Sequence, residues 1–241
     1  DRSLLTIPEV YATNVNSTVG ISGNVTTNVW GQTVRNAVSG SGFIITQDGY
    51  ILTNYHVIDG VSDIKVTLYD GTSYDAELVG GEAENDIAVL KVEAQGLTPV
   101  VIGKSSDLHV GDQVVAIGNP LGDKLRGTMT DGIISAINRD VDVEGRTMTL
   151  IQTNAALNSG NSGGALINAY GQVVGITNMK MQSYATPVEG LGFAIPTATV
   201  KTVVDALIEH GVVGGRPTIG VTVQTVSARQ RAELGCPQGA Y

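Results

Sequence analysis

The segment Asn154-Ala155-Ala156-Leu157-Asn158-Ser159-Gly160-Asn161-Ser162-Gly163-Gly164 is the stretch around which the chain is organised. Because glycines surround Ser162, the backbone there can turn sharply and approach a ligand closely. Such a loop exposes a serine as a nucleophile. The amides of Gly160, Asn161 and Ser162 would point at one spot and stabilise an oxyanion. The same residues also fit an ordinary glycine-rich turn, so this segment alone leaves both interpretations open.

Composition favours a folded protein made mostly of β-strands. The chain has 241 residues, of which 42% are hydrophobic, and it combines 31 glycines with only 5% aromatic residues. This balance suits many short strands joined by tight turns. The formal net charge is −9 and lysine plus arginine number only 14. Because the sequence contains no basic run, it argues against a nucleic-acid partner.

Cysteine usage and hydropathy limit what can hold or target the protein. Cys236 is the single cysteine, which excludes an internal disulfide and a zinc site built from cysteines. No stretch approaches the roughly 18 consecutive apolar residues of a membrane span. The first residues lack the pattern of a signal peptide. We therefore expect either a cytosolic protein or a targeting segment that is missing from this chain.

The order of apolar runs predicts two β units and a C-terminal helix. About seven strands before residue 95 would close a small barrel, and a second β unit begins near residue 112. A short helix is expected within residues 4–14, a loop over 24–35 and a turn over 138–140. Apolar residues at helical spacing predict a helix that Thr197 begins and Gly211 ends: Val200, Val203, Val204, Leu207 and Ile208.

Acyl transfer by a serine also requires a base and an acid that orients the base. Of the three histidines, His109 lies in a polar turn and His210 closes the expected helix, whereas His56 ends an apolar strand where a side chain can face a cleft. A packed core histidine remains an alternative for His56. Asp86 begins a very apolar run, so its carboxylate is expected to be partly buried and to need a donor, although a strand cap is equally open.

Several motifs together resemble the HtrA/DegP-type trypsin-like serine proteases: residues 39–45, 52–58, 85–91, 117–122, 160–164 and 190–196. The resemblance implies a mainly β fold with two six-stranded barrels, about 16–95 and 104–196, followed by the helix 197–210. It also implies a catalytic triad of His56 as base, Asp86 as orienting acid and Ser162 as nucleophile. Gly160, Asn161 and Ser162 would supply the oxyanion hole.

The same resemblance implies a substrate pocket and further segments. The pocket would be apolar and would favour small or medium aliphatic side chains before the cut, with these walls: Ile176, Thr177, Asn178, Leu191 and Phe193. Residues 1–15 would be an N-terminal arm and 211–217 a linker. Residues 218–241 resemble the start of an incomplete PDZ domain, whose carboxylate-binding loop would contain Thr218, Ile219, Gly220 and Val221.

Partners and location also follow from the resemblance. The family suggests unfolded polypeptides as substrates, a homotrimer and a location outside the cytoplasm. A missing N-terminal segment would be either a cleaved signal peptide or a membrane anchor, and the sequence leaves both open. Tyr11 and Trp30 are candidates for contacts between subunits. No cofactor or metal is implied. Three positions depart from the family pattern: Asn154 stands where relatives usually carry aspartate, and Ser159 and Ala165 stand where proline is common.

Two other functions remain as alternatives. A protein that binds unfolded polypeptides without cleaving them would use the same fold. An esterase would use the Gly-x-Ser-x-Gly pattern around Ser162, but its acid and base would have to be Asp205 and His210, which lie five residues apart on one helix and therefore on different faces. Gly103-Lys104-Ser105 resembles the end of a phosphate-binding loop, but Thr98 replaces the earlier glycine that such a loop requires.

Overall fold

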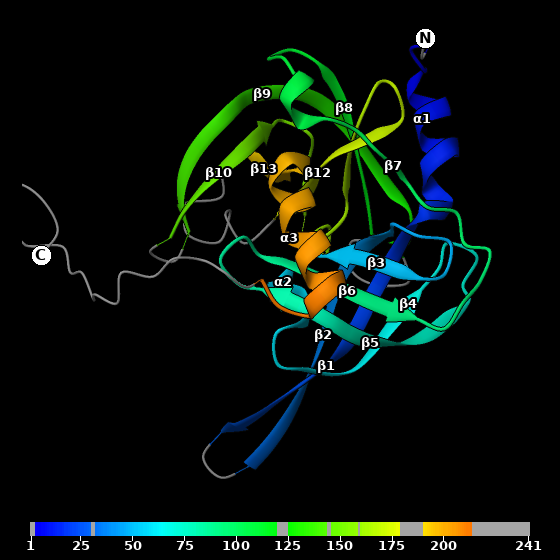
Figure 1. The fold of residues 1–241 in the computed structure, drawn as a ribbon, viewed down its shortest axis with the longest axis vertical. Coiled ribbons are helices and arrows are strands. Elements are labelled where there is room, and N and C mark those ends of the chain that lie inside the picture. The colour runs from blue at the N-terminus through cyan, green and yellow to red at the C-terminus, as the bar shows by residue number, and fades with distance from the viewer. Residues whose placement is uncertain are drawn as a thin grey trace, which may run out of the picture.

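The computed structural model describes residues 3–29, 32–119, 125–143, 146–158, 160–178 and 190–213. Its strands form two β units, one above the other in Figure 1, and the helix α3 (Thr197–His210) lies in front of them in that view. Trp30, Ser159, Cys236 and the segment expected to begin a PDZ domain, with Thr218, Ile219, Gly220 and Val221, lie outside the described residues. The mainly β architecture expected from the sequence is confirmed.

The first unit is a closed barrel in which six strands pair in the order β1-β2-β3-β6-β5-β4. Its strands are β1 (Thr18–Val29), β2 (Gln32–Ile44), β3 (Tyr50–Thr53), β4 (Val61–Thr67), β5 (Ser73–Glu82) and β6 (Ile87–Val92). Ile21, Ile51 and Leu90 are almost fully buried in its interior. Alternate residues of β1 and β3 face this core, as the twofold period of a strand requires.

The second unit contains β7 (Val101–Ile102), β8 (Gln113–Gly118), β9 (Thr128–Val143), β10 (Arg146–Thr153), β11 (Ala165–Asn168), β12 (Gln172–Asn178) and β13 (Gly192–Pro196). Strands pair in the order β11-β8-β9-β10-β13-β12, and β11 also pairs with β12. These pairings close a ring of six strands. The short strand β7 adds to β12 in parallel. The expected barrel limits near residues 95 and 104 stay predictions.

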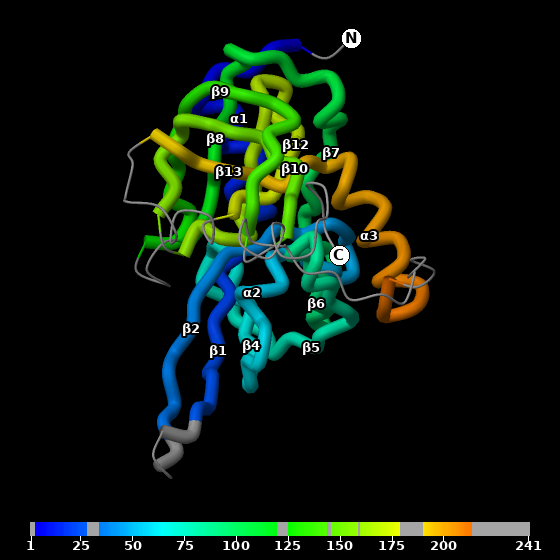
Figure 2. The backbone as a smooth tube through the Cα atoms, turned by 90° about the vertical axis from the view of Figure 1, so that its left-hand side faces the viewer, coloured from blue at the N-terminus to red at the C-terminus, as the bar shows by residue number. Residues whose placement is uncertain are grey.

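Helices cover the sides of the two units. Helix α1 (Ile7–Asn14) begins at Thr6, whose backbone and hydroxyl donate to the carboxylate of Glu9, and a short 3₁₀ turn, η1 (Val15–Ser17), follows it. In Figure 2, α3 lies beside both β units, and it contacts β5 and β6 as well as β12 and β13. Gly211 ends α3 in the left-handed conformation (φ 72°), as predicted.

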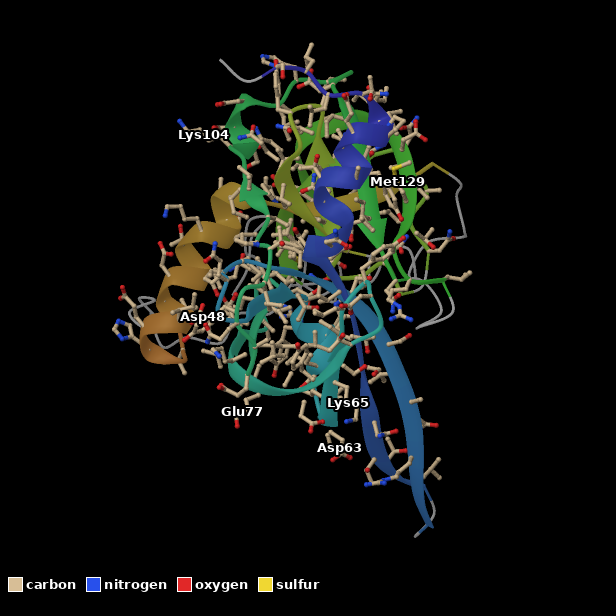
Figure 3. All side chains as sticks on the ribbon, turned by 90° about the vertical axis from the view of Figure 1, so that its right-hand side faces the viewer. Asp48, Asp63, Lys65, Glu77, Lys104 and Met129 are labelled. Atoms are coloured by element: carbon tan, nitrogen blue, oxygen red, sulfur yellow. The ribbon has the colours of Figure 1, made fainter. Side chains whose placement is uncertain are left out.

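Four expectations about local structure are wrong. The segment 24–35 is not a loop, because β1 and β2 continue through much of it and pair with each other. They form an arm that projects from the barrel beyond Asp63 and Lys65 (Figure 3). No turn occurs at 138–140, because β9 continues to Val143 and Asn138 only takes a left-handed kink (φ 52°). Ile208 is 37% exposed, so it lies outside the buried stripe of α3.

The fourth correction concerns His56. The strand β3 ends at Thr53, and His56 lies on a four-residue helix, α2 (Tyr55–Ile58), rather than at the end of a strand. Val57 and Ile58 on this helix are buried in the first barrel. A short apolar run that ends in a helical turn reads as one continuous strand in the sequence, because periodicity cannot separate the two over so few residues.

Candidate active site

Ser162 lies in the tight loop between β10 and β11, and the glycines of that loop are required by its geometry. Gly160 and Gly163 have φ angles of 97° and 83°, a region that residues with a side chain rarely adopt. A Cβ atom on Gly163 would overlap the carbonyl oxygen of Ser41 and the hydroxyl of Thr53. Ser162 itself is only 6% exposed, so the expectation that the loop exposes it is wrong. The loop therefore has one tightly packed conformation, and it packs against the first barrel.

Strand β12 holds this loop from one side. The amide of Gly163 donates to the carbonyl oxygen of Thr177 at 2.9 Å. In return, the amide of Thr177 donates to the carbonyl oxygen of Gly164 at 2.9 Å. The hydroxyl of Thr177 donates to the carbonyl oxygen of Asn161 at 2.5 Å. Because these bonds lie on both sides of Ser162, they fix the backbone that carries its hydroxyl.

Ser41 on β2 holds the loop from the first barrel, a role that sequence analysis missed. Its hydroxyl donates to the carbonyl oxygen of Gly160 at 2.6 Å and accepts the amide of Asn119 at 2.7 Å. Its own amide donates to the carbonyl oxygen of Ser162 at 2.8 Å. Ser41 is fully buried. The only sequence signal was its place in the run Ser39-Gly40-Ser41-Gly42, where small residues allow close approach of two backbones.

His56 and Asp86 are brought together although thirty residues separate them. The carboxylate of Asp86 contacts His56 twice: Oδ2 lies 2.6 Å from the ring Nδ1, and Oδ1 accepts the backbone amide at 2.8 Å. Asp86 is 7% exposed and has a φ of 55°. The amide side chain of Asn54 donates to its carbonyl oxygen at 2.9 Å. This pairing fixes the imidazole and leaves its Nε2 for other chemistry.

The five residues expected to line a substrate pocket do not share one role. Asn178 is 1% exposed, and its side-chain amide donates to Oδ2 of Asp86 at 2.8 Å, so it holds that carboxylate in place. Ile176 packs into the main core and Thr177 bonds the serine loop. Leu191 and Phe193 are half-buried. The role of these last two as walls of a substrate pocket stays a prediction.

Ser162 and the helix that carries His56 meet the same point of β2. A Cβ atom built on Gly40 would lie 2.5 Å from Cγ1 of Val57 and 3.3 Å from the carbonyl oxygen of Ser162. Gly40 therefore lets the two segments approach each other across the junction of the two β units. A cavity of about 170 Å³ adjoins His56 and Asp86 and is walled on its other side by Val143, Arg146 and Met148.

The three amides expected to bind an oxyanion differ in their surroundings. The amide of Asn161 donates to the carbonyl oxygen of Asn158 at 2.9 Å, so it is already bonded within the loop. The oxyanion role expected for Gly160 and Ser162 stays a prediction. The departure at Asn154 is accommodated, since its side-chain oxygen accepts the amide of Ile133 at 2.8 Å, a bond that an aspartate would also accept.

The residues of the esterase alternative are not brought to Ser162. Asp205 pairs with Lys201 on the exposed side of α3, and His210 is an exposed residue beside Glu209. His109 is also exposed, and its amide donates to Asp112 in a turn. Within the described ranges, no group of three or more potential metal ligands occurs. In the same part of the chain, no helix has the length and apolar character needed to cross a bilayer.

Two linked β units with a glycine-bounded serine loop at their junction define the trypsin-like class of peptidase folds, and the family model for the trypsin-like peptidase domain matches residues 40–176. The chain belongs to the HtrA/DegP-type serine proteases. It is 46% identical over 195 residues to the serine protease Do-like HtrB of Bacillus subtilis, covering 78% of this chain and 42% of the relative. It is 45% identical to a probable periplasmic DegP-like serine endoprotease of Chlamydia trachomatis, covering 80% and 38%.

Solved structures agree with this assignment. The HtrA-type protease AlgW with a decapeptide superposes with a TM-score of 0.80 at 33% identity, covering 98% of this chain and 77% of that one. A serine endoprotease from Yersinia pestis gives a TM-score of 0.74 at 36% identity, covering 92% and 73%. The chain spans about two fifths of the length of the two curated relatives named above.

Proposed function

We propose that this protein is a serine endopeptidase that cleaves unfolded or misfolded polypeptides with a triad of His56, Asp86 and Ser162. The observation that carries the proposal is the double contact of the Asp86 carboxylate with His56, at 2.6 and 2.8 Å. Such a contact holds an imidazole in one orientation and one tautomer. Family membership supports the same reaction, since the relatives are named serine proteases and endoproteases.

The chemistry is acyl transfer in two steps. The Ser162 hydroxyl attacks the peptide carbonyl carbon while Nε2 of His56 takes its proton, and the resulting oxyanion is stabilised by the amides of Gly160 and Ser162. The C–N bond then breaks as His56 gives the proton to the departing amine. His56 then takes a proton from a water molecule that attacks the acyl carbon. The ester C–O bond to Ser162 breaks, the carboxylic acid leaves, and His56 returns the proton to the Ser162 oxygen. No cofactor takes part.

Substrate choice is proposed to favour small or medium aliphatic side chains before the cut. The support is the apolar character of Leu191 and Phe193, the two expected walls that remain half-buried. Peptides that end in Val or Ala before a reporter group should be cleaved better than those that end in Arg. Efficient cleavage after Arg alongside poor cleavage after Val would contradict this part of the proposal.

A fluorophosphonate probe tests the activity directly. The probe should label Ser162 in the wild-type chain, and peptide mapping should place it on that residue. Labelling should disappear in Ser162→Ala and His56→Ala, while His109→Ala, which alters an exposed histidine, should be labelled like the wild type. A wild-type chain that binds unfolded polypeptide but takes up no probe would overturn the proposal. That result would favour a protein that binds unfolded polypeptides without cleaving them.

Assembly and location are proposed on the same family basis. The DegP-like relative from Chlamydia trachomatis is named as periplasmic, so we place this protein outside the cytoplasm. A homotrimer that uses Tyr11 and Trp30 at its contacts is the expected assembly. Sedimentation of the wild type and of Tyr11→Ala would test it, since a wild-type monomer at micromolar concentration would contradict the trimer.

A further inference from the structure

The turn that carries Asp86 is held from within by the carboxylate of Glu82. This carboxylate is buried and accepts the amides of Glu84 at 3.0 Å and of Asn85 at 2.8 Å, together with the side-chain amide of Asn85 at 2.9 Å. The turn ends at Asp86, whose left-handed backbone (φ 55°) is unfavourable for a residue with a side chain. A conformation of this kind persists only where surrounding contacts determine it.

The second β unit supplies a further contact to the same turn. Arg146, the first residue of β10, donates from its guanidinium to the carbonyl oxygen of Ala83 at 2.5 Å. The two residues are separated by 63 positions and lie on different β units. A charged donor makes a stronger hydrogen bond than a neutral one. Arg146 therefore ties the β9–β10 hairpin to the backbone three residues before Asp86.

The position of Arg146 beside the candidate catalytic residues is set by the hairpin. Val143, its partner across the strand pair, is 5% exposed, and Met148, two residues along β10, is 8% exposed. Both belong to the main core. Together with Arg146 they wall the cavity of about 170 Å³ that His56 and Asp86 line from the first barrel. Because the apolar neighbours anchor the hairpin, the guanidinium is presented at a fixed point.

We propose that Arg146 is a positioning residue that holds the Asp86 turn, and through it the imidazole of His56, in the geometry that catalysis needs. The inference rests on the proposed function, because it assigns a role within that triad. Arg146 acts through the Ala83 carbonyl and touches neither reacting atom. The second β unit therefore contributes to the acid and base of the first, in addition to carrying the nucleophile.

The variant Arg146→Gln tests this role, with Arg146→Lys as the conservative replacement and Thr149→Val as a matched control. Thr149 lies on the same strand, and its hydroxyl donates to Asp140 across the hairpin at 2.7 Å without touching the Asp86 turn. Loss of one charge-assisted hydrogen bond should lower kcat by about tenfold to a hundredfold in Arg146→Gln. KM should change less than about twofold, because substrate binding is not removed.

Two further readouts separate positioning from a structural role. Arg146→Lys, which retains a charged donor, should recover part of the lost kcat. The downfield proton NMR signal of the hydrogen bond between His56 and Asp86 should weaken in Arg146→Gln while the urea midpoint stays close to that of Thr149→Val. Two results would overturn the inference. One is a kcat in Arg146→Gln equal to that of Thr149→Val, and the other is a lower kcat accompanied by a urea midpoint below that of Thr149→Val.

The outcomes distinguish this inference from the proposed function. If the fluorophosphonate probe labels neither the wild type nor Thr149→Val, the triad itself fails. If the probe labels both of them and labels Arg146→Gln at the same rate, the triad stands and only the role of Arg146 is lost. Labelling that is slow in Arg146→Gln and faster in Arg146→Lys supports both.

Discussion

The carboxylate of Asp86 grips His56 at two points, with Oδ2 at 2.6 Å from the ring Nδ1 and Oδ1 at 2.8 Å from the backbone amide. The second contact joins the carboxylate to the backbone of α2, so the carboxylate is fixed relative to the helix that bears the ring. The amide of Asn178 then bonds Oδ2 from the other β unit at 2.8 Å. Both units therefore fix one carboxylate.

The first prediction concerns the charge of Asp86. Asp86→Asn retains the shape of the side chain but removes the carboxylate that orients the imidazole, and in serine triads such a change lowers kcat by roughly 10⁴-fold. We expect a loss of at least about 10³-fold in peptide hydrolysis, with a native circular dichroism spectrum. The matched control is Asp75→Asn, which removes an exposed partner of Lys65 and should leave kcat unchanged. A modest loss would show that another group orients His56.

The second prediction separates two roles for Asn178, which are support of the Asp86 carboxylate and a place in the wall of the substrate pocket. If its amide supports Asp86, Asn178→Ala should lower kcat with KM nearly unchanged, and leaving a buried acceptor short of a donor should cost roughly 1–3 kcal/mol in the free energy of unfolding. Phe193→Ala should instead change the preference between Val-ending and Ala-ending substrates. A changed preference in Asn178→Ala, with kcat retained, would return Asn178 to the pocket wall.

Ser41 should matter for the loop of Ser162 although it lies on another barrel. Ser41→Ala removes the donor to the Gly160 carbonyl and the acceptor of the Asn119 amide. We expect slower fluorophosphonate labelling, with a smaller loss than the roughly 10²–10³-fold caused by removing an oxyanion donor outright. Ser39→Ala, two residues away and exposed, is the control, and equal labelling rates for the two variants would argue against this role.

Alanine variants of Gly163 and Gly60 test why the loop of Ser162 requires glycine. They separate the cost of a left-handed backbone from the cost of a side chain that has no space. Both have positive φ angles, 83° and 66°. A Cβ on Gly60 meets nothing within 4 Å, whereas one on Gly163 overlaps Ser41 and Thr53. Gly60→Ala should cost about 1–2 kcal/mol for the left-handed backbone alone. Gly163→Ala should cost clearly more in urea unfolding, and a similar cost for both would contradict the packing around Ser162.

Tyr11 gives a prediction for alkaline pH. Burial, aided by the neighbouring Tyr69, raises the pKa of Tyr11 to about 12, and its hydroxyl donates to the carbonyl oxygen of Gly127 at 3.0 Å. The pKa of the Tyr11 hydroxyl in the folded protein exceeds its ordinary value of about 10. The stability that the neutral hydroxyl contributes to the fold is therefore fully present below pH 10 and is lost as the pH rises toward 12. Urea unfolding at pH 9 and pH 11 should show a smaller decrease for Tyr11→Phe than for the wild type. Equal decreases would contradict the shift.

Much of the fold followed from local patterns. Apolar runs predicted two β units, of which the second begins with β8 at Gln113, close to the expected residue 112. The stripe over Val200, Val203, Val204 and Leu207 predicted α3 together with its end at Gly211. The arm at 24–35 was missed because its residues are polar. Pairing between β1 and β2 runs along the arm, and β1 also pairs with β4 at Asn24 and Val25.

The sequence by itself determined which residues are the candidates for the chemistry: a serine among glycines, a histidine after an apolar run and an aspartate before one. Only the tertiary structure decided how they are held. Ser41 from one barrel, and Arg146 and Asn178 from the other, reach the site across separations of 63 to 119 residues. These contacts leave no mark in local composition, because a hydrogen bond depends on where two distant strands meet, and only the closed packing of both β units sets that.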